Sequence, residues 1–517
     1  MKLKQLLLFS GILALLFYSC ESPSSPRRPV YEGQGGGREN GKFYAQDIAK
    51  GVFYSLYAEM LHENEKCKVW AEKGSGMTID DAKEVAKAYL SIYEKMLPVF
   101  GFTENSLNTM DIADYYGNED GKLCILLLKI RDGYTPASGS YVAGYFSALD
   151  FFGYNPADYY TWFSNESDMI YINVNVAEHK PGEENLNRTL AHEMQHLMNF
   201  VTTLEKRSTM NSNNQIIQLN QMDIWIDEGL SAAAEWVYAN PAGTLYGTHS
   251  ENRVNWYKNN GIGSGSQIKG LIDRGNNFFV WGNREDQNPY AVQDDYATVY
   301  LFFQWLRLQA NSTDIYNKII TSSSFDYGAV TIAANTYMPG NGYTSWETLL
   351  KTWLAANHIM ASTGKYGYMN DIMLRQINTH SAPSGTTSIS LAPGEGVYSK
   401  TNSQPVLSGQ GSSIRNTYLN KSNSQVNDSS FYSGGAMLTF NANTNTKGFP
   451  ETGKTTGTAN IDIVPASLIM QTPTQPSLSG PYQISAGDML RRNGHGDIFR
   501  FPRRGLLQNR RVIAAHE

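Results

Sequence analysis

Residues 189–200 read TLAHEMQHLMNF, and this stretch decides the fold and the chemistry expected of the chain. On a helix, His192 and His196 are four residues apart, so both imidazoles project from one face. Two neutral imidazoles at that separation can bind one zinc ion, and Glu193 can act as general base on a zinc-activated water. Apolar residues recur around the motif at helical spacing, so we expect a half-buried helix over residues 189–200.

A catalytic zinc ion needs a third protein ligand and one open position. Residues 225–231 read WIDEGLS, and Glu228 within them is our candidate for that ligand. We expect Asp227 to cap a helix that Glu228 opens, after a run of bulky apolar residues. A carboxylate in such surroundings is unusual as a surface charge. The competing interpretation is that Glu228 only favours the helix dipole.

Together the two segments resemble the gluzincin metallopeptidases, in which the glutamate of the second motif is the third zinc ligand. Within that group the chain is most similar to the hyicolysin-type neutral metallopeptidases, over residues 52–378. Further stretches that carry the resemblance are residues 120–130, 139–145 and 169–175. A metzincin is excluded, because the residues after His196 read LMNFVT and lack the glycine and third histidine of that class.

The resemblance also implies a tyrosine or histidine from a later helix that stabilises the oxyanion formed during peptide hydrolysis. Residues 294–306 are strongly apolar and of helical length. Tyr296 near their start is the first candidate, because its separation from Glu228 resembles that in gluzincins. Tyr300 on the same helical face is the second candidate, and His249 is the third. With 32 tyrosines in the chain, a packing role is the alternative for each tyrosine.

Glu235 follows Glu228 by seven residues and resembles a second acidic residue of some gluzincins, which orients a zinc-binding histidine from outside the ligand set. A solvated surface carboxylate is an equally good interpretation of Glu235. The aspartate that thermolysin-like enzymes place four residues after the ligand is replaced here by Ala232. A Gly-x-Met-Glu-Asn segment, typical of gluzincin aminopeptidases, is absent upstream of His192, which favours an endopeptidase.

Residues 1–19 have the form of a signal peptide, with lysines at positions 2 and 4 before an apolar stretch. Ser19 and Cys20 after it resemble the processing site of bacterial lipoproteins, in which Cys20 would carry the lipid anchor. Simple secretion is the alternative. Residues 20–43 are rich in Ser, Pro and Gly and are expected to form a flexible tether. No later apolar stretch is long enough to predict a membrane span.

A chain of 517 residues can form two or three domains. Its net charge of −6 gives no indication of a nucleic-acid partner. Residues 44–378 are expected to form an α+β, zincin-like metallopeptidase domain with a mixed N-terminal half and a mainly helical C-terminal half. Residues 379–517 are expected to form a small β-rich accessory region of unknown role, with a tail that could be disordered.

Within the mixed half, patterns typical of helices occur at residues 48–62 and 79–100, the second opened by a capping signal. Residues 124–129 and 169–175 have the pattern of strands. We expect residues 169–175 to be the edge strand that binds substrate backbone. Cys67 and Cys124 could form a disulfide or remain as two buried thiols.

These patterns predict a zinc-dependent endopeptidase, exported to a bacterial cell envelope and lipid-anchored, that hydrolyses peptide bonds of extracellular proteins. One catalytic Zn²⁺ would be bound by His192, His196 and Glu228, with protein or peptide substrates as partners. The alternative is a surface lipoprotein with a catalytically inert peptidase fold that binds a host or matrix ligand.

Overall fold

The computed structural model describes the protein in segments that form two compact units. The first unit comprises residues 1–221 and 464–517, and the second comprises residues 222–463. The described segments are residues 41–101, 121–134, 141–153, 162–176, 179–212, 216–240, 249–258, 278–281, 292–374, 377, 388–389, 391–400, 406–407, 413–430, 432–444 and 512–515. The predicted signal peptide and Cys20 lie outside these segments.

A mixed sheet of seven strands forms the first unit, with strand order β1-β2-β3-β4-β6-β5-β15. Its strands are β1 (Lys42–Asp47), β2 (Val52–Glu63), β3 (Cys67–Glu72), β4 (Leu123–Leu128), β5 (Tyr141–Phe146), β6 (Met169–Asn173) and β15 (Val512–Ala515). Strand β4 pairs in parallel with both β3 and β6, and the other neighbours are antiparallel. Every residue of β4 is buried, which agrees with its uniformly apolar sequence LCILLL.

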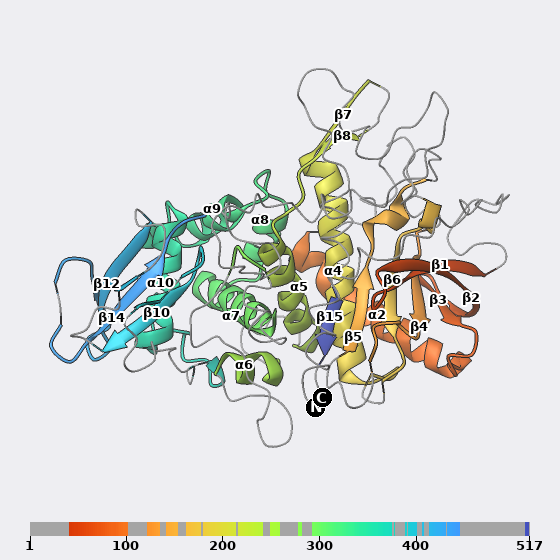
Figure 1. The fold of residues 1–517 in the computed structure, drawn as a ribbon, viewed down its shortest axis with the longest axis horizontal. Coiled ribbons are helices and arrows are strands. Elements are labelled where there is room, and N and C mark those ends of the chain that lie inside the picture. Colours follow the sequence, from red (N-terminus) through yellow and green to blue (C-terminus); the bar gives the residue numbers. More distant parts are fainter. Residues whose placement is uncertain are drawn as a thin grey trace, which may run out of the picture. The chain divides into compact units, whose positions relative to one another are not determined.

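Two long helices pack against this sheet (Figure 1). Helix α2 (Ile79–Phe100) contacts β2 and β3, helix α4 (Glu184–Arg207) contacts β5 and β6, and the two helices contact each other. The capping signal predicted at the start of α2 is confirmed, because Thr78 and Asp81 form a reciprocal capping box. A short helix η2 (Ala148–Phe151) and the hairpin of β7 (Ser208–Met210) and β8 (Ile216–Leu219) complete the described elements of this unit.

A glycine brings α4 unusually close to the sheet. A Cβ atom on Gly144 of β5 would lie 2.8 Å from Thr189 Cγ2 and 2.8 Å from the carbonyl oxygen of Tyr171. The same Cβ would lie 3.3 Å from Glu193 Cγ. The missing side chain therefore sets how near the helix that carries the HEMQH sequence can approach β5.

The helix predicted over residues 48–62 is wrong, because residues 52–63 form strand β2. Along β2, Leu56 and Ala58 are buried while Tyr57 and Glu59 are exposed, which is the period of two expected of a strand with one covered face. Pairing with β1 and β3 on either side outweighs the helical pattern of the local sequence.

The strands predicted at residues 124–129 and 169–175 are confirmed as β4 and β6, to within two residues. The prediction that residues 169–175 form an edge strand is wrong. Strand β6 lies inside the sheet, where β4 and β5 hydrogen-bond to its two sides. Strand β5, which also contacts α4, pairs with one side of β6, and β15 pairs with the other side of β5.

The second unit consists of helices followed by short strands. Its helices are α5 (Ile224–Ala239), α6 (Glu251–Tyr257), α7 (Val292–Ala310), α8 (Asp314–Ile320), α9 (Tyr327–Tyr337), η5 (Pro339–Asn341) and α10 (Trp346–Ile359). Its strands are β9 (Ser388–Ile389), β10 (Gly396–Lys400), β11 (Val406–Leu407), β12 (Ile414–Asn420), β13 (Gln425–Asn427) and β14 (Ala436–Asn441). Helices and sheets thus coexist in the chain as predicted. None of the helices in the described segments has both the length and the apolar character needed to cross a membrane.

Aromatic side chains form the core of the second unit. The Trp225 ring lies 5.3 Å from Phe278 and 5.2 Å from Trp346, measured between centroids. Phe302 of α7 and Phe278 each lie 5.4 Å from the Trp353 ring. These aromatic contacts, of which Trp225–Trp346 is tilted and the others are edge-to-face, fix α5, α7 and α10 against one another.

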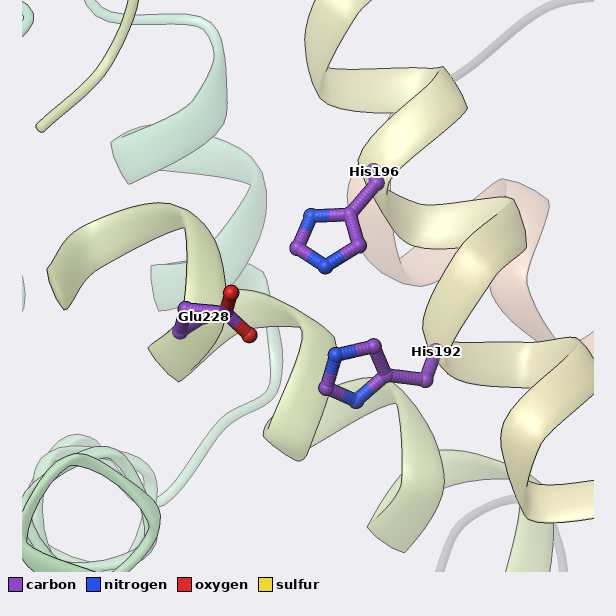
Figure 2. A group of neighbouring side chains, drawn as sticks. All are labelled: His192, His196 and Glu228. Carbon is purple, nitrogen blue, oxygen red and sulfur yellow. The ribbon is translucent and has the colours of Figure 1, made fainter. Parts of the chain in front are cut away.

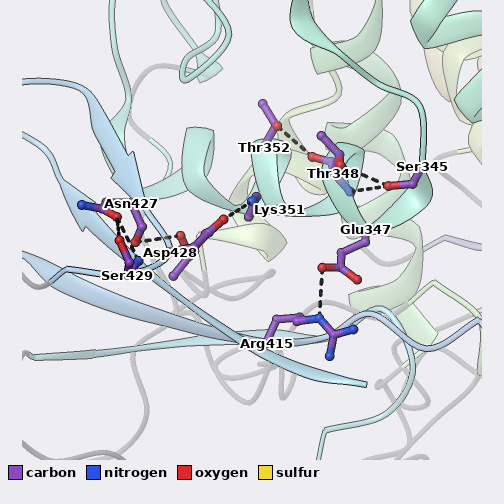
Figure 3. A network of polar contacts seen from close by, with 10 residues as sticks. Ser345, Glu347, Thr348, Lys351, Thr352, Arg415, Asn427, Asp428 and Ser429 are labelled. Carbon is purple, nitrogen blue, oxygen red and sulfur yellow. Dashed lines mark hydrogen bonds and ion pairs between the residues drawn. The ribbon is translucent and has the colours of Figure 1, made fainter. Parts of the chain in front are cut away.

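The β-rich region after residue 388 packs on α10 and belongs to the same compact unit as helices α5–α10. Four of its strands form an antiparallel sheet in the order β10-β14-β12-β13. Two ion pairs connect this sheet to α10, Glu347–Arg415 at 3.0 Å and Lys351–Asp428 at 2.7 Å (Figure 3). The domain boundary expected after residue 378 stays a prediction.

Cys67 and Cys124 lie on the paired strands β3 and β4, and no disulfide joins these two described residues. Both side chains are buried, and burial raises the pKa of the Cys67 thiol to about 12. Of the two alternatives that the sequence left open, the pair of buried thiols is therefore correct.

Replacement of Gly144 by alanine should destabilise the first unit. The added Cβ meets a backbone oxygen that cannot move without disturbing β6, so we expect a loss of about 1–3 kcal/mol in the free energy of unfolding. Urea denaturation of Gly144→Ala measures this loss. Gly340→Ala is the matched control, because a Cβ at residue 340 meets nothing within 4 Å. Equal denaturation midpoints for the two variants would contradict the steric argument.

Candidate metal centre

Helix α4 carries both histidines of the HEMQH sequence. The helix predicted over residues 189–200 lies within Glu184–Arg207 and extends further at both ends. His192 and His196 are one turn apart, and their ring centroids are 4.8 Å from each other. Every residue from 189 to 204 is buried, so α4 is covered more completely than its amphipathic pattern predicts. Helix α2, strands β5 and β6, and the β7–β8 hairpin all pack against it.

A carboxylate meets the two imidazoles. The ligand atoms of His192, His196 and Glu228 all lie within 4.8 Å of one another, and all three residues are buried. Figure 2 shows both rings and the Glu228 carboxylate directed toward a common space, with the histidines on α4 and the glutamate on α5. The three residues that the sequence singled out are thus brought together.

The donor set fits a zinc ion. Two imidazole nitrogens and one carboxylate oxygen are typical protein ligands of catalytic zinc, which keeps a fourth position open. The same donors also suit cobalt or manganese. Within the part of the chain that the structure describes, this is the sole group of three or more His, Cys, Asp or Glu side chains placed to hold one metal ion.

Glu193 is fully buried beside His192 and packs with its side-chain stem against β5, close to Gly144. A carboxylate that is shielded from bulk water next to a candidate ligand histidine is compatible with the predicted role of general base. The sequence alone could not place Glu193 relative to the sheet, because the contact depends on the absence of a side chain at residue 144.

Helix α5 begins earlier than predicted. Asp223 precedes its first residue, Ile224, and the Asp223 carbonyl accepts hydrogen bonds from the N–H groups of Ile226 and Asp227. Asp227 is therefore inside the helix, and its predicted role as the cap is wrong. The apolar residues at 224–226 are helical because Trp225 packs into the aromatic core.

The glycine of the WIDEGLS sequence has a packing role next to the candidate ligand. A Cβ atom on Gly229 would lie 2.3–2.8 Å from three ring carbons of Phe303 on α7. Helices α5 and α7 can therefore approach closely beside Glu228, and this approach depends on glycine at residue 229.

Tyr296, the first candidate for the oxyanion donor, lies near the start of α7 and is buried. The Arg253 guanidinium carbon lies 4.5 Å from the centroid of its ring, and the Trp281 ring meets it edge-on at 5.1 Å. Glu235, predicted either to orient a histidine or to be solvated, is buried, and its Oε1 lies 3.5 Å from Arg253 Nη2.

The second and third candidates, Tyr300 and His249, contact each other. His249 Nδ1 lies 2.9 Å from Tyr300 Oη, and His249 Nε2 lies 3.0 Å from Asp371 Oδ2. The Ser250 N–H also donates to Tyr300 Oη, at 3.1 Å. Burial opposes ionisation of Asp371, but His249 and two backbone N–H groups outweigh it and hold the pKa of this carboxyl below its usual value. These contacts hold Tyr300 and His249 in the packing around α7, and the choice of Tyr296 as oxyanion donor stays a prediction.

His179 connects α4 to the end of β6. Its Nδ1 lies 2.5 Å from the carbonyl oxygen of Asn173, and its Nε2 lies 3.0 Å from Thr189 Oγ1, one turn before His192. Burial lowers the pKa of His179 to about 4, so the ring is neutral at physiological pH.

Two residues near the candidate donors, Arg253 and Asp371, were not predicted. Neither lies in a motif or a periodic pattern, and Asp371 meets His249 across 122 positions of sequence. Only the folded arrangement of α6, α7 and the segment after α10 reveals their partners.

Comparison with known proteins finds a partial similarity to a metalloprotease. No protein-family model matches the chain. Over 209 residues it is 28% identical to the neutral metalloprotease ShpI of Staphylococcus hyicus, and this region is 39% of our chain and 39% of that protein. The chain thus spans about two fifths of the length of the relative it matches. This similarity supports a metallopeptidase relationship and no finer family, and a metal-ligand triad is consistent with it.

The buried neutral His179 should make the fold sensitive to acid. The unfolded chain binds a proton at this residue near pH 6.5, whereas the folded chain binds it only near pH 4. The contribution of His179 to stability is therefore complete above pH 6.5 and is lost as the pH falls toward 4, by at most about 3 kcal/mol. Chemical denaturation of metal-free wild type and His179→Gln at pH 7 and pH 4.5 should show a smaller pH effect in the variant. An identical pH effect in both proteins would contradict the assignment.

Proposed function

We propose that the chain is a zinc-dependent endopeptidase of the gluzincin type with a zincin-like fold, most similar to the hyicolysin-type neutral metallopeptidases. His192, His196 and Glu228 would bind one zinc ion. The observation that carries the proposal is that the ligand atoms of these three buried residues lie within 4.8 Å of one another. The partial similarity to a neutral metalloprotease supports the same conclusion.

The chemistry divides between the ion and the side chains. When bound, a zinc ion with three protein ligands lowers the pKa of a coordinated water molecule and polarises a carbonyl group. Glu193 accepts the proton that water loses as its oxygen attacks the scissile carbonyl carbon. The same proton passes from Glu193 to the amine nitrogen when the C–N bond breaks. The hydroxyl of Tyr296 donates a hydrogen bond to the oxyanion that develops on the substrate.

The proposed substrates are extracellular proteins or peptides. This part of the proposal rests on the signal-like residues 1–19 and on Cys20, which would carry a lipid anchor in the bacterial cell envelope. An endopeptidase is preferred to an aminopeptidase because the sequence lacks a Gly-x-Met-Glu-Asn segment upstream of His192. Secretion without a lipid is the alternative for the mature protein.

A catalytically inert surface protein is the less favoured function. An inert peptidase fold would tend to lose a ligand or the base, whereas this chain retains Glu193 and all three candidate ligands. Purified wild type that binds one zinc ion but fails to hydrolyse casein or a mixed peptide library would favour the inert alternative.

Replacement of Glu193 by glutamine should abolish peptidase activity without loss of metal. The amide keeps the size of the side chain but cannot accept the proton, so we expect kcat to fall by about 10²–10⁴-fold. Casein hydrolysis measures activity, and elemental analysis of the purified protein measures bound zinc.

The matched control for this prediction is Glu205→Gln, on the exposed side of the same helix α4. Glu205→Gln should cleave casein as wild type does. If Glu193→Gln binds one zinc ion and also cleaves at the wild-type rate, Glu193 is not the base and the mechanism fails.

A further inference from the structure

The short helix α6 lies along the beginning of α7 and contacts it through evenly spaced side chains. Three contacts connect residues 249–256 to the first turns of α7, and they run in opposite directions along the two segments. They are His249 with Tyr300, Arg253 with Tyr296, and Trp256 with Asp294. The middle contact is the one that involves the proposed oxyanion donor.

Arg253 is an unusual residue for this position because it is charged and buried. A buried guanidinium requires compensation, since its transfer from water is costly. Glu235 provides a counter-charge at 3.5 Å, and Gln293 accepts a hydrogen bond from Arg253 Nη1 at 3.4 Å. The side chains of Arg253 and Glu235 are only 9% and 7% exposed, so this pair is held well away from bulk water.

The Arg253–Glu235 pair connects helix α5, which carries the candidate ligand Glu228, to Tyr296 on α7. Glu235 lies two turns after Glu228 on the same face of α5, about 10 Å along the helix axis. From Glu235 the contacts continue through Arg253 to the ring of Tyr296 on α7. The rigid helix α5 therefore relates the position of the Tyr296 ring to that of the third candidate ligand.

The ring of Tyr296 is held on two sides. The planar guanidinium of Arg253 lies over the ring, and the Trp281 ring meets it at an interplanar angle of 83°. An arginine suits this role better than a lysine, because its planar group can stack on the ring and bind a carboxylate in the same conformation. Loss of the guanidinium would remove one of the contacts that restrain the χ angles of the ring, and thereby the direction of the hydroxyl.

We propose that Arg253, anchored by Glu235, is a positioning residue that fixes the Tyr296 ring and aims its hydroxyl at the reaction. This inference rests on the proposed peptidase function and on the role of Tyr296 in it. Arg253 itself contacts neither substrate nor metal in this proposal. Its effect on catalysis passes entirely through the tyrosine.

A double-mutant cycle tests this dependence. The variants are Arg253→Met, which keeps a long apolar stem, Tyr296→Phe, and the double variant, each assayed for kcat and KM on a fluorogenic peptide. We expect Arg253→Met to lower kcat by about 10- to 100-fold through misorientation, with little change in KM or bound zinc. In the Tyr296→Phe background the same change should have almost no further effect. Arg253→Lys should recover part of the lost kcat, because the cation over the ring is retained.

The matched control is Arg131→Met. Arg131 also stacks on a tyrosine, Tyr54, at 3.5 Å, but it lies in the other unit and outside the proposed site. Arg131→Met should leave kcat and bound zinc unchanged. Equal losses of kcat for Arg253→Met in the presence and absence of the Tyr296 hydroxyl would overturn the proposal, and so would an effect confined to KM.

A second measurement does not depend on turnover. In protein labelled with ¹³C at the tyrosine ring, the Tyr296 resonance is identified by its loss in Tyr296→Phe. We expect this resonance to shift and to show faster ring flipping in Arg253→Met, and an unchanged resonance would overturn the proposal. If wild type binds zinc but hydrolyses nothing while the resonance responds as expected, the peptidase function fails and the structural role of Arg253 stands.

Discussion

Two imidazoles and a carboxylate are withdrawn from water into one small space, and the proposed chemistry depends on that juxtaposition. Groups of this kind are costly to bury unless a charge or hydrogen bonds compensate them, and a divalent cation is the compensation that His192, His196 and Glu228 suit. Close packing and hydrogen bonds around these three residues position the helices that carry them. Gly144 lets α4 lie against β5, His179 ties the same helix to the end of β6, and Gly229 lets α7 approach α5.

Much of this arrangement could be predicted from the sequence because it is encoded locally. The spacing of His192 and His196 fixes their common face on any helix, and the capping box at Thr78 marks the start of α2. Glu228 could be named because it lies among apolar residues and because residues 225–231 resemble the second motif of the gluzincins. Predictions from the local sequence pattern were wrong where contacts with distant parts of the chain determine the secondary structure. Residues 52–63 form a strand because they pair with β1 and β3. Helix α5 begins at Ile224, and its second residue, Trp225, packs into the aromatic core.

The residues that the sequence did not reveal are those whose partners are distant along the chain. Asp371 pairs with His249, and Arg253 joins Glu235 to Tyr296, but neither Asp371 nor Arg253 lies in a motif. Strand order is hidden for the same reason, since β6 becomes an interior strand only when β5 pairs with its second side. The sequence thus indicates the candidate ligands and base, whereas the residues that contact and orient them carry little sequence signal. This division is expected, because chemistry selects residue types at fixed spacing, whereas support requires only contact in space.

X-ray absorption at the zinc edge tests the central claim most directly. We expect the purified protein to contain one zinc ion with two imidazole nitrogens at about 2.0–2.1 Å and a carboxylate oxygen at about 2.0–2.2 Å. The imidazole signal should disappear in a variant with both His192 and His196 replaced, and the carboxylate signal should change in Glu228→Gln. A spectrum of bound zinc that is unchanged by all three replacements would contradict the account.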